Sequence, residues 1–255
     1  LLTASDMKWM MRDHFEGTPY DMTNDIGAGP YKVPYRWRPM TFTVDSVEYT
    51  HERAIATQQT GFSFVAQLRG DLPAYLRGLL WFGTDDANTS VYLPVFCSVK
   101  KAPAQLAHGD INTLDWNSNF WVNNYVANQA YNRYSLMIPD IRRVQSKLER
   151  DIEEDVRVAI EQIPAFSDEE ICHNLTQDLA DIWAERATTE YKKLGDYLFV
   201  KFLDGNMKKT DADHNFVKSE HGMPVYPEFP GYDDRYFRTI VDDAGPRLRV
   251  NKISY

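Results

Sequence analysis

The stretch Phe62-Ser63-Phe64-Val65-Ala66-Gln67-Leu68-Arg69 decides the fold class of this chain. Its residues alternate between two faces, which is the period of a β-strand. One face holds Phe62, Phe64, Ala66 and Leu68, and the other holds Ser63, Val65, Gln67 and Arg69. Leu79–Phe82 and Ser90–Val99 predict two more strands, and the turn between them at Asp85–Asn88 makes them antiparallel neighbours. Pro94 cannot donate a ladder hydrogen bond, so we expect the last strand at a sheet edge or a bulge.

The spacing of apolar residues changes to that of helices from Asn119 onward. A first helix is expected from this point, with a kink or break at Pro139. Residues 141–163 predict a long amphipathic helix, and Pro164 ends it. The apolar stripe predicted for the next helix consists of Ile171, Leu175, Leu179, Ile182, Trp183 and Leu194. These two helices are expected to form an antiparallel hairpin that covers the sheet, so the fold class is α+β.

The two ends of the chain are more polar. Residues 6–15 have helical spacing, 18–39 predict a loop rich in Gly and Pro, and 41–47 alternate like a strand. Residues 1–205 are expected to form one unit, with strands concentrated in 40–100 and helices in 119–204. Residues 206–255 predict an irregular C-terminal tail.

Composition excludes several classes of function. The chain has 255 residues and a formal net charge of −9, with no long basic run, so nucleic acid is not an expected partner. No apolar stretch reaches the roughly 20 residues that span a bilayer. The six histidines and two cysteines lack metal-ligand spacing, and we expect no metal and no cofactor. The sequence does not choose between a cytoplasmic and a bacterial periplasmic or secreted location.

Three ordered stretches in the first two-thirds of the chain resemble one enzyme family. They are Arg12–Asp21 with Gly29–Trp37, then Phe62–Arg69 with Leu80–Gly83 and Ser90–Pro94, then Phe120–Val126 with Tyr134-Ser135 and Asp140–Arg142. Together these stretches resemble the dipeptidases among the N-terminal-nucleophile cysteine hydrolases. That family includes the lactobacillar dipeptidases and is related to the secernins.

The resemblance implies half of a four-layer α-β-β-α sandwich and hydrolysis of the amide bond of dipeptides. In such enzymes the nucleophile is a cysteine exposed as the first residue after processing, and its free α-amine is the base. This chain begins Leu1-Leu2-Thr3-Ala4, and its cysteines are Cys97 and Cys172. We therefore expect a C-terminal part of such an enzyme, without the nucleophile and inactive alone. A missing N-terminal part of the same protein would then be its partner.

Candidate site residues follow from the chemistry of a dipeptide, which has a free amine and a free carboxylate. Asp21 and Arg36 are candidates for these two charged ends, although a loop-stabilising ion pair explains them equally well. Ser63, Gln67, Arg69 and Asn88 could supply hydrogen bonds from strands or beside them. Asn24 weakly resembles an asparagine at a strand end in the related bile-salt and penicillin hydrolases. Each of these could instead be a satisfied structural group.

Three functions remain open from the sequence: a cysteine dipeptidase, a non-catalytic peptide-binding or structural module, and an amidase for non-peptide amides. The face with Phe62, Phe64, Ala66 and Leu68 is expected to be exposed or buried against another copy, so a homo-oligomer is possible.

Overall fold

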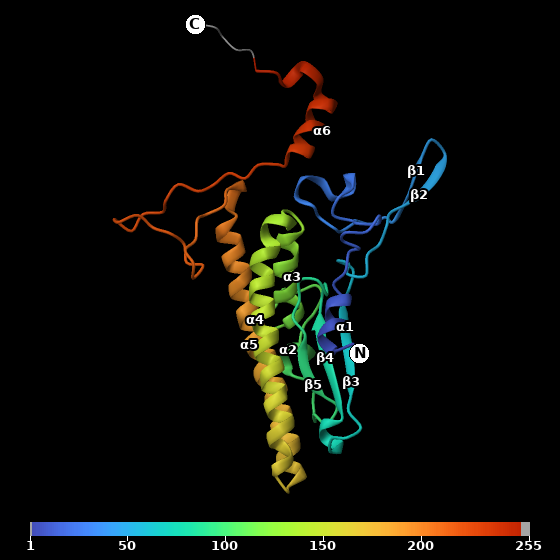
Figure 1. Ribbon diagram of the computed structural model, residues 1–255, viewed down its shortest axis with the longest axis vertical. Coiled ribbons are helices and arrows are strands. Elements are labelled where there is room, and N and C mark those ends of the chain that lie inside the picture. The colour runs from blue at the N-terminus through green and yellow to red at the C-terminus, as the bar shows by residue number, and fades with distance from the viewer. Residues whose placement is uncertain (1, 251–255) are drawn as a thin grey trace.

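The computed structural model describes residues 2–250. Figure 1 shows a sheet beside a bundle of long helices, with a hairpin and a C-terminal segment that project from this body. The strands are β1 (Thr41–Val44), β2 (Val47–Thr50), β3 (Phe62–Leu68), β4 (Gly78–Thr84) and β5 (Leu93–Phe96). The helices are α1 (Ala4–Met10), α2 (Ala104–Ala107), α3 (Asn119–Ala130), α4 (Tyr134–Gln162), α5 (Glu169–Lys201) and α6 (Asp234–Ala244).

The main sheet has the order β3-β4-β5, and both pairs are antiparallel. Phe62 pairs with Thr84 and Leu68 with Gly78, so β3 and β4 match over their whole length. The strand β5 lies at the edge of this sheet, so the predicted edge position is confirmed. Because no strand pairs with the open side of β5, the missing N–H of Pro94 costs no ladder hydrogen bond on that side.

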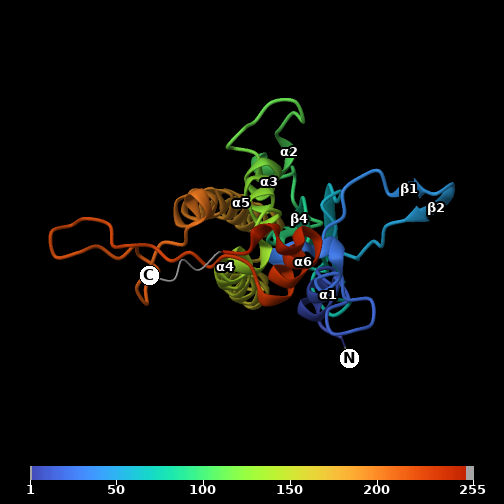
Figure 2. The ribbon, with the colours of Figure 1, turned by 90° about the horizontal axis from the view of Figure 1, so that it is seen from above.

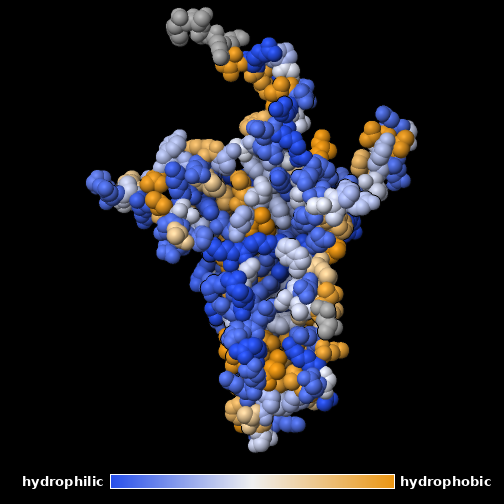
Figure 3. Space-filling model, viewed as in Figure 1, coloured by the Kyte–Doolittle hydropathy of each residue, from blue (hydrophilic) through white to orange (hydrophobic). Residues whose placement is uncertain are grey.

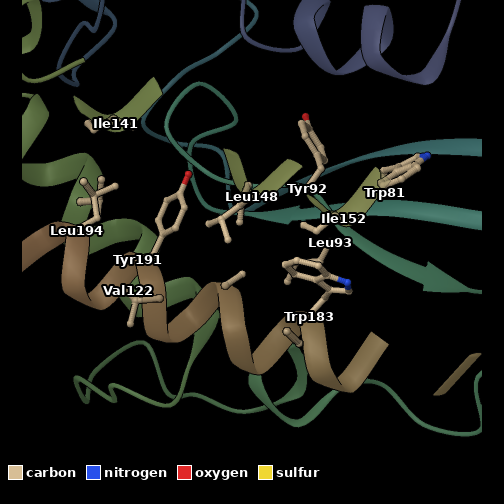
Figure 4. Close-up of a cluster of buried hydrophobic side chains, with 14 of the residues drawn as sticks. Trp81, Tyr92, Leu93, Val122, Ile141, Leu148, Ile152, Trp183, Tyr191 and Leu194 are labelled. Atoms are coloured by element: carbon tan, nitrogen blue, oxygen red, sulfur yellow. The ribbon is translucent and has the colours of Figure 1, made fainter. Parts of the chain in front are cut away.

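Long helices cover one face of the sheet. Viewed from above, α3, α4 and α5 lie together on one side of β4 (Figure 2). The short helix α1 lies next to β3 (Figure 1). The helices α4 and α5 run antiparallel, as the predicted hairpin requires (Figure 1). Trp183 and Tyr191 project from α5 into the core between the helices and the strands, where they meet Leu148 and Leu93 (Figure 4).

The predicted apolar stripe of α5 is confirmed at Trp183 and Leu194, which are buried, and at Leu175 and Leu179, which pack against the core. It is wrong at Ile171 and Ile182, which are exposed, whereas Thr176, Ala180 and Ala187 are buried. Small side chains allow close approach of α3: a Cβ on Gly195 would lie 2.3 Å from Cδ1 of Tyr125. The helix therefore buries its small residues, and two of its large aliphatic side chains point outward.

Three further predictions need correction at element ends. The first helix spans only Ala4–Met10, because the following residues turn to bring Arg12 and His14 into the protein. The expected break at Pro139 lies instead at 131–133, and Pro139 is the sixth residue of α4. At this position the missing backbone N–H of the proline removes only one hydrogen bond, to a carbonyl of the first helical turn. The predicted strand at 41–47 is a hairpin, β1–β2, with a turn at Asp45 and Ser46.

The other face of β3 is exposed. Phe62 is 60% exposed, Phe64 49% and Leu68 82%, which confirms the expected uncovered face. Apolar side chains are visible along the side of the molecule formed by β3 (Figure 3). Within residues 2–250 the fold is thus α+β, with one helical layer on a three-stranded sheet and a separate two-stranded hairpin.

The C-terminal tail is not wholly irregular. It contains α6, which begins at the N-cap Asp233 and lies against the 3₁₀ helix Ile26–Tyr31 of the opening loop. A ring contact between Tyr31 and Tyr232 and a hydrogen bond from Arg235 to the Asn24 carbonyl fix it there. The last predicted tail residues, 251–255, lie outside the described part of the chain.

Candidate functional site

Polar residues concentrate in the connection between β4 and β5, residues 85–92, which we call the polar loop. Asp85, Asp86, Asn88, Thr89 and Ser90 are each at most 1% exposed. A loop normally keeps such groups in water, because burial without partners costs free energy. This loop is instead enclosed by side chains from every long helix and from the opening segment.

Two tyrosines from outside the polar loop bind side chains in its first part. The Asp86 carboxylate accepts hydrogen bonds from Tyr35 Oη at 2.5 Å and from Thr89 Oγ1 at 3.2 Å. Asn88 Nδ2 donates to the hydroxyls of Tyr35 and Tyr134, both at 3.0 Å. Burial and the charge of Asp86 raise the pKa of Tyr35 well above its ordinary value, so the phenol remains a donor at neutral pH.

Helices hold the backbone of the same loop. From α4, Arg142 donates to the carbonyl and side chain of Asn88, and Gln145 Nε2 donates to the carbonyls of Asn88 and Ser90. From α5, Tyr191 Oη donates to the Thr89 carbonyl at 2.8 Å.

A buried ion pair closes this side of the loop. Arg12 donates to the Ala87 and Ser90 carbonyls and pairs with Glu149 of α4 at 2.5 Å. Burial alone would lower the pKa of Arg12, but Glu149 outweighs it and the pKa is raised. The polar loop is therefore positioned by residues far apart in sequence.

Asp85 differs from its neighbours in three ways. Its φ is +65°, a left-handed conformation that is strained for a residue with a Cβ. Its Oδ1 accepts a hydrogen bond from Asn124 Nδ2 at 3.0 Å, whereas its buried Oδ2 has no partner within residues 2–250. Burial, aided by the Asp86 charge, raises the pKa of Asp85 to about 7. Strain and a shifted pKa in one residue are typical of a functional site.

A series of aromatic contacts begins at Tyr35, which donates to Asp86. Tyr131 contacts the Tyr35 ring at 4.6 Å between centroids, and the exposed Trp37 contacts Tyr131 at 5.6 Å. Burial and the charges of Asp86 and Asp85 raise the pKa of Tyr131, and its buried hydroxyl has no partner in the described chain. The site thus holds an unpaired acceptor and an unpaired donor among aromatic rings.

A histidine lies on the other side of Tyr35. The fully buried His14 packs edge-on against Tyr35 and Tyr134, and its Nδ1 lies 3.1 Å from Glu16 Oε1. Burial alone would raise the pKa of Glu16, but hydrogen bonds from His14 and the local backbone lower it to about 2.

This arrangement suits proton exchange or binding of a cationic amine. A carboxyl with a pKa of about 7 gains or loses a proton near neutral pH. No group of three metal-ligating side chains occurs within residues 2–250.

The structure corrects the role predicted for Arg36. Its guanidinium is buried and pairs with Asp25 at 2.6 Å, not with Asp21. Its terminal nitrogens also donate to the carbonyls of Met22, Val33 and Tyr35. Because both nitrogens are used inside the loop, Arg36 is not free to bind a peptide carboxylate.

Asp21 and Asn24 also stabilise the opening loop. The Asp21 carboxylate accepts hydrogen bonds from Gly17 N, Thr23 N and Oγ1, and Asn24 Nδ2. Burial alone would raise the pKa of Asp21, but these bonds outweigh it and lower the pKa. Their geometry is that of an Asx turn, not of an open binding group.

The four candidates near strands do not form one site. Asn88 lies in the polar loop, and Ser63 Oγ lies 2.9 Å from Tyr92 Oη at the adjoining end of β3. Gln67 and Arg69 lie toward the opposite end, about 13 Å and about 20 Å along the strand from Ser63 at roughly 3.3 Å per residue. Gln67 accepts a hydrogen bond from Trp81 Nε1 at 3.1 Å.

Neither thiol belongs to the polar loop. Cys97 pairs through its backbone with Gly78, at the end of β4 distant from the loop. Cys172 is fully buried in α5, and its thiol donates to the carbonyls of Ile163 and Phe166.

Sequence reasoning identified Asn88 but missed Asp85 and Tyr131. Two adjacent acids directly after a buried strand are the available signal for Asp85, but the sequence pattern predicts only a turn there. Tyr131 gave no signal, because its position depends on where α3 ends.

The chain is similar in sequence to known proteins. Dipeptidase A of Lactobacillus helveticus is 23% identical over 223 residues, which are 88% of this chain and 40% of that protein. The chain thus spans less than half the length of this curated relative. The family model of peptidase family C69 matches residues 1–147, which is more than half of the chain and includes the polar loop. The chain therefore belongs to peptidase family C69.

Proposed function

We propose that the full-length protein hydrolyses dipeptides as a cysteine peptidase of the N-terminal-nucleophile type. Membership of peptidase family C69 and the likeness to a protein named Dipeptidase A support the peptidase class. The observation that carries the proposal furthest is the polar loop, where a strained, buried aspartate titrates near neutral pH inside the matched region.

In this proposal the nucleophile is a cysteine outside these 255 residues. The thiols of Cys97 and Cys172 support this view, because one lies at the distant end of β4 and the other is enclosed in α5. This chain would then supply groups that bind and orient the substrate, and the second sheet of an α-β-β-α sandwich would come from the rest of the protein.

Asp85 is the proposed partner of the free α-ammonium of the dipeptide. An ammonium next to Oδ2 would supply the missing donor and lower the cost of ionising a buried carboxylate. Asp85 is 1% exposed, so substrate entry requires movement of the residues around it.

A non-catalytic peptide-binding or structural module is the second candidate. The observation that favours it is the complete enclosure of the loop: Asp86 and Asn88 are 0% exposed and fully hydrogen-bonded. A network of this kind can serve rigidity alone.

The test is a comparison of substrates by the full-length protein. A free dipeptide, its N-acetyl derivative and a non-peptide amide would be supplied in parallel. Dipeptidase activity with recognition of the ammonium predicts turnover of the first and little turnover of the others. Preference for the non-peptide amide would indicate the amidase alternative, and no turnover would favour the module.

A further inference from the structure

A cavity of about 280 Å³ lies between α1, the C-terminal end of β3 and the second half of α4. Its lining includes Gln67, Arg69, Trp81, Glu153, Ile160 and Glu161. Arg157 also lines it, and its guanidinium is paired with Glu154 and Glu161. It lies at the opposite end of β3 from the polar loop, so it is a separate place in the fold. Figure 3 shows apolar side chains between α4 and the strands in this half of the molecule.

Arg69 is the unsatisfied charge of this cavity. Its Nη1 is buried and has no hydrogen-bond partner in the part of the chain that the structure describes. Burial lowers the pKa of Arg69, and the nearby Asp71 only partly offsets this effect. A guanidinium has a planar set of donors that matches a carboxylate, so a carboxylate is the ligand group that would satisfy it.

Two acids in the same cavity favour a ligand that also has a positive charge. Glu153 uses Oε1 for Ser5 Oγ at 2.9 Å and Lys8 Nζ at 2.6 Å. Glu161 uses Oε1 for Arg157 at 2.6 Å. Within residues 2–250 the second oxygen of each acid accepts no hydrogen bond, so both remain available to an ammonium.

Apolar side chains supply the rest of the lining. Val156 and Ile160 come from α4, and the indole of Trp81 is fixed by its hydrogen bond to Gln67. Lys8 Nζ lies 3.9 Å from the centroid of that ring, which further fixes the indole. The volume is near the lower end of the roughly 300–1,000 Å³ that is typical of ligand pockets, so the ligand is small.

We propose that this cavity binds a free amino acid with an apolar side chain. Arg69 binds the carboxylate, Glu153 and Glu161 face the ammonium, and Trp81 and Ile160 contact the side chain. Free amino acids are also the products of the dipeptide hydrolysis proposed above, but binding here does not depend on that activity.

Calorimetric titration of the 255-residue chain tests this proposal. The probes are L-leucine, L-leucinamide, which lacks the carboxylate, and N-acetyl-L-leucine, which lacks the ammonium. We expect saturable binding of L-leucine with a Kd of about 1 mM and at least about tenfold weaker binding of both derivatives. Equal binding of L-leucine and L-leucinamide, or no saturable binding of L-leucine, would overturn the proposal.

Single substitutions test which side chains of the cavity bind L-leucine. Arg69→Gln should weaken L-leucine binding by at least about tenfold, and Arg69→Lys should restore part of it. Arg77→Gln is the matched control, because Arg77 is exposed on the adjoining strand connection and lies outside the cavity. If Arg69→Gln fails to fold, Glu161→Gln on the exposed face of α4 gives the second measurement. This variant should bind L-leucine more weakly, whereas its binding of N-acetyl-L-leucine should be unchanged. Unchanged L-leucine binding in the folded variants would refute the assignment.

Discussion

Asp85 shows how one residue can be both a cost to stability and a candidate for function. Its folded-state pKa of about 7 lies above the ordinary 3.8, so the folded protein holds this proton more tightly than the unfolded chain. Both states are protonated well below pH 4. Between pH 4 and 7 the unfolded state loses the proton first, so stability falls as pH rises. Above pH 7 the penalty is constant, at about 4 kcal/mol as an upper estimate from the three-unit difference.

Replacing Asp85 by Asn should therefore stabilise the protein at pH 8 and have little effect near pH 4. The amide oxygen can still accept the bond from Asn124, and the buried charge is gone. Thermal unfolding of both proteins across this range measures the effect. Asp178→Asn, at an exposed position of α5, is the control. The same pH dependence in Asp85→Asn and in the control would contradict the raised pKa.

Arg36 is predicted to stabilise the loop rather than to bind substrate. Arg36→Met should lower the free energy of unfolding by about 2–3 kcal/mol, because it removes a buried ion pair and leaves three carbonyls without a donor. Urea unfolding gives this value, and a double-mutant cycle with Asp25→Asn isolates the pair. A stable Arg36→Met protein with a raised KM for dipeptides would instead support a substrate role.

At the scale of elements, the strands were predictable and the packing of α5 was not. The alternation in 62–69 specifies a two-faced strand, and the position of Pro94 specifies an edge, so both follow from local sequence. Which small residues of α5 are buried depends on α3, since Gly195 lies against Tyr125 of that helix. Asn88 was predictable as a polar residue beside a strand. The polar loop around it was not, because Tyr35, Tyr134, Arg142 and Tyr191 reach it from distant segments.

Gly195→Ala tests this helix contact by the sign of its effect. In an exposed helix the change would stabilise by about 1 kcal/mol, but overpacking costs about 1–3 kcal/mol. We expect net destabilisation, since the new Cβ would lie 2.3 Å from the Tyr125 ring. In a Tyr125→Ala background the same substitution should be neutral or stabilising. Stabilisation by Gly195→Ala in the unaltered protein would show that α3 does not approach so closely.

At the scale of the whole molecule, the uncovered face of β3 should govern association. Phe62, Phe64 and Leu68 form an apolar surface on a strand at the edge of the sheet. Replacing all three with threonine, which keeps strand propensity, should reduce self-association of the 255-residue chain. Sedimentation velocity measures this, with Ile171→Thr and Ile182→Thr on α5 as the control for loss of exposed apolar area. Unchanged association in the β3 variant would exclude this face as the contact.

No helix among the described residues is long and apolar enough to cross a membrane. The chain spans 40% of its dipeptidase relative, and dipeptide hydrolysis is our proposal for the whole protein. In that protein the polar loop would contribute the recognition of a free α-ammonium.

The pH dependence of dipeptide hydrolysis by the full-length protein, with and without Asp85→Asn, is the most direct test of the role proposed for Asp85. We predict that the unaltered protein hydrolyses dipeptides and that its kcat/KM rises through a pKa near 7 as Asp85 ionises. The Asn variant should lose this step and at least about tenfold in kcat/KM, mainly through KM, because substrate binding loses a charge partner. A folded Asp85→Asn protein with the same kcat/KM and the same pH profile as the unaltered enzyme would contradict the proposed role of Asp85 in binding the dipeptide ammonium.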